Sequence, residues 1–176
     1  MPTSLYDLSV PSYLQTVTAV AGYLDKGFEF CTGKGIDVNE IVESRLFADM
    51  LPFRFQILSV AHHSLGAVEG LKKGVFAPPK QPEALDYRGL QKLIADTVIG
   101  LQRLTPTEVN ALEGRDMVFQ MRDRQIPFTA EGFILSFSLP NFYFHATTGY
   151  DILRTKGVAL GKRDFLGQLR LKRSAS

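Results

Sequence analysis

The sequence is poor in cysteine and histidine and has almost no excess of either charge, and each shortage excludes a class of function. Cys31 is the only cysteine, so no intramolecular disulfide can form and we expect a reducing compartment. The net charge is +2 over 176 residues, which gives no general basic surface for nucleic acid. With three histidines and a cysteine on the apolar stripe of a helix, neither a serine nor a cysteine triad is supported.

Long apolar runs are also missing. The most apolar stretch, Phe133–Ala146, is too short to span a bilayer and contains proline, asparagine and histidine. The N-terminal residues Met1–Asp7 lack the basic start and apolar core of a signal peptide. We therefore expect a soluble cytoplasmic protein with no membrane or nucleic-acid partner. We also expect one domain over residues 1–167, followed by a flexible basic tail over residues 168–176.

Apolar spacing predicts four long amphipathic helices joined by short segments. The alternation of three- and four-residue steps indicates helices over about 10–31, 48–73, 86–104 and 130–156. Short helices are expected after Asp37 and at the capping box Thr105–Glu108. A small β-hairpin is expected around Arg122–Arg124, before the last long helix. The pattern predicts an all-α four-helix bundle.

The last long helix contains a polar pair in apolar surroundings. Asn141 and His145 are four residues apart, so they lie on one helix face, one turn from each other. Pro140 should kink the helix just before them. A buried polar group needs a partner, which here is a metal, a bound molecule or another side chain. The sequence leaves these three possibilities open.

Three C-terminal motifs and two N-terminal motifs resemble one uncharacterised family of bacteria and fungi. That family, a domain of unknown function, is grouped with the DinB/YfiT-like superfamily of inferred metalloenzymes. The motifs cover nearly the whole chain and lie at residues 4–11, 45–56, 128–133, 139–154 and 157–167. The resemblance implies a DinB/YfiT-like bundle of up-down-down-up type, often found as a homodimer.

The resemblance also implies a metal site. In the superfamily, one histidine of the second helix and two of the fourth hold a divalent ion, typically nickel or zinc. His145 corresponds to the second of the fourth-helix histidines, whereas Asn141 replaces the first. Asparagine is a weak ligand for zinc or nickel. For the second helix, rotation about its axis puts His62 at the border of the apolar face and His63 well outside it, so His62 is favoured and His63 stays the alternative ligand.

Two classes of function follow. In the first, His62 and His145 hold a metal, Asn141 completes or orients the site, and the protein is a metal-assisted transferase or hydrolase. In the second, the protein is not an enzyme: a metal-free pocket binds an unknown small molecule, or the helical faces form a dimeric interaction protein. The sequence does not decide whether the protein is an enzyme, or whether any metal is its cofactor.

Overall fold

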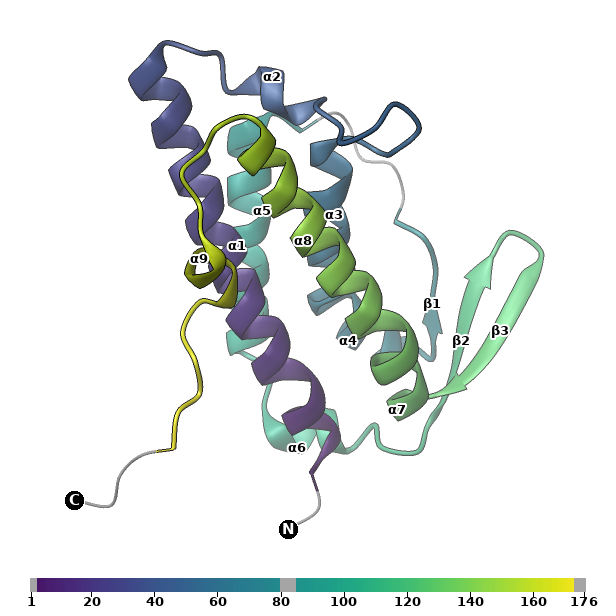
Figure 1. Ribbon diagram of the computed structural model, residues 1–176. Helices are drawn as coiled ribbons and strands as arrows, with labels where there is room; N and C mark the ends of the chain where they lie inside the picture. Colours follow the sequence, from purple (N-terminus) through teal and green to yellow (C-terminus); the bar gives the residue numbers. More distant parts are fainter. Residues whose placement is uncertain (1–2, 80–84, 173–176) are drawn as a thin grey trace.

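The computed structural model describes residues 3–79 and 85–172, and four helices pack together at its centre (Figure 1). These helices are α1 (Leu5–Lys34), α3 (Phe53–His62), α5 (Tyr87–Gln102) and α8 (Leu139–Thr155). Helix α1 contacts α5 and α8, and α3 contacts the same two helices, so each has two neighbours. Their inward faces form the core. The mainly helical class predicted from the sequence is confirmed, whereas the up-down-down-up order stays a prediction.

Local capping signals define several helix ends. Ser4 and Asp7 form a capping box before α1, so the helix begins at Leu5 and Pro11 lies in its second turn rather than its first. Gly35 ends α1 with a left-handed backbone, φ 65°. Asp86 caps α5 by accepting a hydrogen bond from the Gly89 amide. Buried Cys31 lies on the inner stripe of α1, as expected.

The predicted second helix is two helices. After α3 ends at His62, the chain turns at His63 and Ser64 and resumes as α4 (Leu65–Lys73). The Ser64 hydroxyl donates to the Val60 carbonyl at 2.7 Å and thereby competes with the backbone ladder. The break follows His63, whose amide still donates to the Ser59 carbonyl at 2.8 Å.

A three-stranded sheet lies beside the bundle, on the right of Figure 1. Its strands are β1 (Val75–Phe76), β2 (Asp116–Met121) and β3 (Arg124–Thr129). The predicted hairpin is β2 and β3, and Pro127 lies on the edge strand, where a missing amide is tolerated. Strand β1 pairs in parallel with β2, although the sequence suggests only an extended connector over residues 76–82. Residues 80–82 of that connector lie outside the described residues.

The fourth long helix changes its hydrogen-bonding pattern before Asn141. It begins as α7 (Ala130–Phe133), continues as the π-helix η1 (Ile134–Ser138) and then becomes α8. Pro140 has no amide proton, so a regular ladder cannot pass through it, and the π-turn precedes this gap. Where the sequence predicts a kink, the hydrogen-bonding pattern changes from a π-helix to an α-helix.

The remaining helices are short. They are α2 (Asn39–Val42), α6 (Pro106–Asn110) and α9 (Lys162–Leu166). Helix α9 returns to the bundle, where Phe165 packs on Tyr150 with ring centroids 6.0 Å apart. Of the predicted flexible tail, residues 173–176 lie outside the described residues. Within the described ranges, no helix has the length and apolar character needed to cross a membrane.

Candidate functional site

His145 is anchored by a buried glutamine on the neighbouring helix. Its Nδ1 lies 2.8 Å from Oε1 of Gln56, which is 2% exposed. The Gln56 Nε2 donates to the Leu51 carbonyl at 2.8 Å, which fixes the orientation of the amide. Because an amide oxygen only accepts, the proton of neutral His145 is on Nδ1. The Nε2 lone pair is therefore left for another partner.

His63 lies against His145. The two ring centroids are 5.8 Å apart and the ring planes differ by 21°. His63 is 7% exposed, and its Nδ1 is a buried polar atom with no hydrogen-bond partner among the described residues. An unsatisfied buried nitrogen is unusual and calls for an explanation.

Both rings are uncharged at neutral pH. Burial, followed by the neighbouring imidazoles of His62 and His145, lowers the pKa of His63 to about 3. Burial lowers the pKa of His145 to about 4. Two neutral imidazoles side by side offer both hydrogen-bond donors and acceptors.

His62 lies beside His63, with ring centroids 5.5 Å apart, but its hydrogen bond is made elsewhere. Its Nε2 donates to the Ala77 carbonyl at 2.8 Å, and its ring stacks on Phe76 at 4.3 Å. The sequence-based expectation that His63 lies outside the apolar face is wrong: His63 is buried and meets His145. The His63 amide still donates to the Ser59 carbonyl at 2.8 Å, so His63 keeps the register of α3 and shares a face with buried Gln56, seven residues earlier. The preference for His62 came from a wrong assignment of the buried face of the helix.

The side-chain amide of Asn141 is bonded to the backbone of its own helix. Its Nδ2 donates to the Phe137 carbonyl at 2.7 Å, one turn back along its own chain. This carbonyl belongs to η1, where the regular ladder is disturbed before Pro140. The amide of Asn141 is therefore engaged in helix hydrogen bonding, and Asn141 and His145 have separate hydrogen-bond partners, the Phe137 carbonyl and Gln56.

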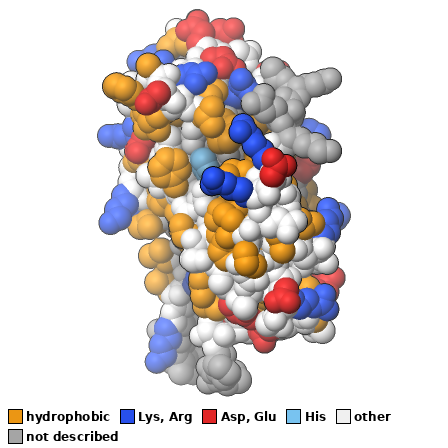
Figure 2. All heavy atoms as spheres, turned by 90° about the vertical axis from the view of Figure 1, so that its right-hand side faces the viewer, with side chains coloured by type: hydrophobic (Ala, Val, Ile, Leu, Met, Phe, Trp, Pro, Cys, Tyr) orange, Lys and Arg blue, Asp and Glu red, His pale blue; other side chains and the backbone are white. Residues whose placement is uncertain are grey.

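Aromatic rings enclose the histidine pair. His63 packs on Phe76 and Phe137, with ring centroids 5.4 Å and 5.7 Å away. Phe55 meets the ring of His145 edge-on at 5.8 Å. Figure 2, which views the hairpin side of the molecule, shows a histidine side chain between hydrophobic and basic side chains. The histidine pair is thus a polar group in an aromatic lining.

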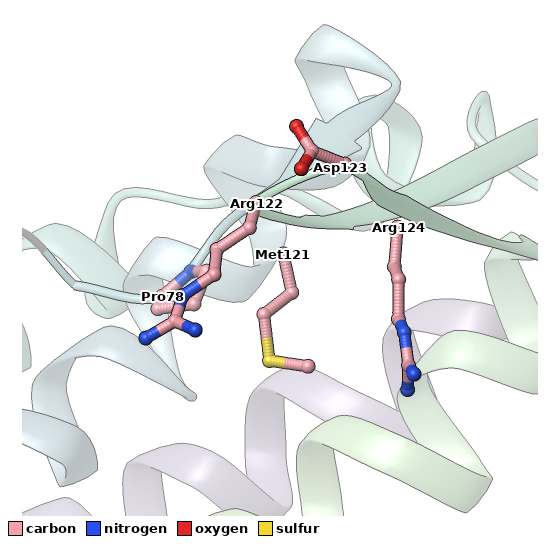
Figure 3. A pocket seen from close by; sticks show the side chains of 5 residues that line it. All are labelled: Pro78, Met121, Arg122, Asp123 and Arg124. Carbon is pink, nitrogen blue, oxygen red and sulfur yellow. The ribbon is translucent and has the colours of Figure 1, made fainter.

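Two hollows lie on either side of Pro78. One, of about 770 Å³, is lined by Pro78 and the hairpin turn Met121–Arg124 (Figure 3). The other, of about 570 Å³, includes His62, Pro78 and Leu65 in its lining. Neither hollow is lined by His63 or His145. The unsatisfied Nδ1 of His63 therefore does not open into either of them.

The donor set does not fit a resident zinc or nickel ion. Catalytic sites of these metals use three protein ligands, and in the described part of the chain no three His, Cys, Asp or Glu side chains converge. His62 and Asn141 are each turned to a backbone carbonyl. The ligand set of His62, Asn141 and His145 stays a prediction, with these two hydrogen bonds against it.

Gln56 is the site residue that the sequence analysis did not single out, whereas His63 was the less favoured of two candidates on the second helix. Gln56 is an amide within the apolar seam of α3, and this was the signal available for it. His63 follows Gln56 by seven residues and therefore lies on the same helix face, which was its signal.

Comparison with known proteins identifies the family. The profile of the family described as "Domain of unknown function (DUF1993)" matches residues 5–166. The chain belongs to this family. A solved structure similar to the DUF1993 chain is that of a DinB family member from Shewanella denitrificans, with 27% identity and a TM-score of 0.81. The alignment covers 97% of this chain and 96% of that one. No curated protein matches the chain.

Proposed function

We propose that the protein binds a small organic molecule without a metal, at the His63–His145 pair. The observation that carries the proposal is the buried Nδ1 of His63, which has no hydrogen-bond partner among the described residues although its ring lies against His145. A ligand that supplies the missing hydrogen bond removes the free-energy cost of burying that nitrogen without a partner. Few polar groups within an apolar lining are typical of small-molecule sites.

The neutral state of both rings supports this function. At pH 7 each imidazole carries one N–H donor and one lone-pair acceptor, since their pKa values are about 3 and about 4. Gln56 fixes the proton of His145 on Nδ1, so its Nε2 is offered as an acceptor. The ligand therefore presents a donor group, such as a hydroxyl or amide, toward His145 and an apolar body toward the phenylalanines.

The test uses small aromatic probes and the histidine signals. Phenol and benzamide are titrated into chelator-treated protein, and long-range ¹H–¹⁵N NMR of the imidazoles records the tautomers. We expect the His63 and His145 signals to shift with either probe. His145→Ala should weaken binding about tenfold, equivalent to one good hydrogen bond. His62→Gln is the matched control, because His62 is bonded to Ala77.

Two binding results would contradict the proposal. Either no probe binds the wild type, or His145→Ala binds the probes as tightly as the wild type, and in both cases the histidine pair is not a ligand site. Near-stoichiometric nickel or zinc in protein purified without chelator, lost in His145→Ala, would instead support the metal-assisted transferase or hydrolase. The predicted homodimer is a separate prediction, which light scattering tests directly.

A further inference from the structure

The smaller of the two hollows beside Pro78 lies where α3 and α4 meet α5. It has a volume of about 570 Å³, and most of the described residues that line it are leucine, alanine or proline. Each of the three helices contributes one leucine, namely Leu58, Leu65 and Leu93. The polar members of the lining are His62, Glu69 and Thr97. An apolar lining with few polar groups is typical of a site for a small organic molecule.

The polar side chains of this hollow offer hydrogen-bond acceptors. His62 donates through Nε2 to the Ala77 carbonyl, and burial lowers the pKa of its ring, so at pH 7.5 its Nδ1 carries a lone pair. The Thr97 hydroxyl donates its proton to the Leu93 carbonyl at 2.7 Å. The third polar group is the Glu69 carboxylate, and no lysine or arginine is among the described residues of the lining. The hollow therefore favours a ligand that brings donors.

Gly66 brings the other two acceptors, His62 and Glu69, to one place. A Cβ added to Gly66 would lie 3.3 Å from the His62 Nδ1, so this side of α4 borders that nitrogen. Glu69 follows Gly66 by three residues in the same helix, which puts its Cβ about 5–6 Å from that position. Helical side chains lean toward the helix N-terminus, and this directs Glu69 back toward Gly66. The carboxylate and the Nδ1 lone pair thus border the space that the glycine leaves open.

The carboxylate of Glu69 is available to a cation. Its Oε1 lies 3.2 Å from the Lys72 Nζ, in a pair whose side chains are 45% and 35% exposed. Such an exposed pair contributes little to stability, so a ligand can replace Lys72 at small cost. An ammonium group has three donors and the charge opposite to a carboxylate.

We propose that this hollow binds an organic primary amine in its protonated form. The ammonium group lies between the Glu69 carboxylate and the His62 Nδ1 and donates a hydrogen bond to each. The apolar body of the amine lies against the leucines of α3, α4 and α5. The site is separate from the histidine pair of the proposed function, because neither histidine of that pair lines the hollow.

The experiment compares two probes of one shape and different charge. Benzylamine and benzyl alcohol are titrated into the full-length, chelator-treated protein at pH 7.5 and low salt, and NMR records the ¹⁵N signals of the His62 ring. We expect benzylamine to bind about tenfold more tightly, as a charge-assisted hydrogen bond adds about that factor. It should also shift the Nδ1 signal of His62. Glu69→Gln should remove the preference, so that the two probes bind equally.

A second variant tests the position of the ammonium group without changing the charge. Gly66→Ala places a Cβ 3.3 Å from the His62 Nδ1, and alanine is favourable in a helix. Benzylamine should therefore bind about tenfold more weakly to a variant that folds normally by circular dichroism. The matched control is Gly22→Ala, where the added Cβ meets open space. If Gly66→Ala binds benzylamine as tightly as Gly22→Ala does, the proposed position is wrong.

The control for charge is Glu29→Gln, which removes a carboxylate from an exposed residue of α1. It should keep the preference for benzylamine. Equal binding of the two probes by the wild type would overturn the inference. So would an equal loss of preference in Glu29→Gln and Glu69→Gln, since net charge would then explain it. Benzylamine that binds without shifting the His62 signals would have its site elsewhere, and this result would overturn the inference as well.

Discussion

Replacing His63 by leucine should make the protein more stable, and increasingly so toward acid pH. The wild-type ring is buried among Phe76 and Phe137 with one nitrogen unpartnered among the described residues. Leaving such a polar atom buried costs about 1–3 kcal/mol. His63→Leu removes the atom and keeps a side chain of similar volume, at the expense of some ring packing. We expect a net gain of about 1 kcal/mol at pH 7.5.

The pH dependence follows from the pKa of His63, which is 6.5 in its ordinary state and about 3 in the fold. Because the folded pKa is lowered, the unfolded chain binds the proton more strongly. The stability is complete above pH 6.5 and is lost as the pH falls toward the folded value. At pH 5 the loss for this group is about 2 kcal/mol. The variant lacks this loss, so its advantage should grow to about 3 kcal/mol.

Urea unfolding followed by circular dichroism at pH 7.5, 6.5 and 5.0 measures the stability gain of the variant at neutral pH and its increase toward pH 5. The matched control is His62→Gln, which removes a histidine of the same segment whose Nε2 is bonded to Ala77. Its effect on the pH slope should be smaller. If His63→Leu is destabilised at pH 7.5 and loses stability with acid as steeply as the wild type, then His63 is neither unsatisfied nor neutral, and our reasoning is refuted.

Other substitutions test the packing that positions the site. Tyr13→Phe removes a buried hydroxyl 2.7 Å from the Ser138 Oγ, and should lower the free energy of unfolding by about 1 kcal/mol; no change in urea unfolding would show that this bond contributes nothing. Gly149→Ala places a Cβ 3.0 Å from the Tyr23 hydroxyl, so a loss of about 1–3 kcal/mol is expected, with a shift of the histidine NMR signals. Gly22→Ala, where a Cβ meets open space, should gain about 0.5–1 kcal/mol, and a loss there would contradict the helix geometry.

The features of the fold that depend on neighbouring residues were predictable from the sequence. The Thr105–Glu108 capping box opens α6 as expected, because both of its hydrogen bonds lie within four residues. Gly74 ends α4 with φ 73° for the same local reason. Strand β1 was missed because two residues carry no periodic signal and are fixed only by pairing with β2.

The break at His63 was not predictable, because a distant residue stabilises it. The Ser138 hydroxyl donates to the His63 carbonyl at 2.7 Å, across a separation of 75 residues. This bond satisfies a carbonyl that would otherwise need the next turn of the helix. Local propensity favours an uninterrupted helix through His63, so periodicity alone predicts no break there. The break leaves the His63 amide bonded to the Ser59 carbonyl, and the burial of His63 follows from the face of α3 on which it lies. The sequence places Asn141 correctly on the helix. It does not predict the π-helix whose Phe137 carbonyl accepts the hydrogen bond from the Asn141 amide.

The polar side chains at the centre of the site differ in one respect that bears on function. Gln56 and Asn141 have hydrogen bonds from the fold, and so does His62. The Nδ1 of His63, in contrast, has no hydrogen-bond partner in the described part of the chain. Functional groups are commonly retained at the expense of stability. If the nitrogen of His63 serves a ligand, His63→Leu must raise the unfolding free energy and abolish probe binding together. A variant that gains stability and still binds benzamide normally would show that the unsatisfied atom is a defect of packing alone.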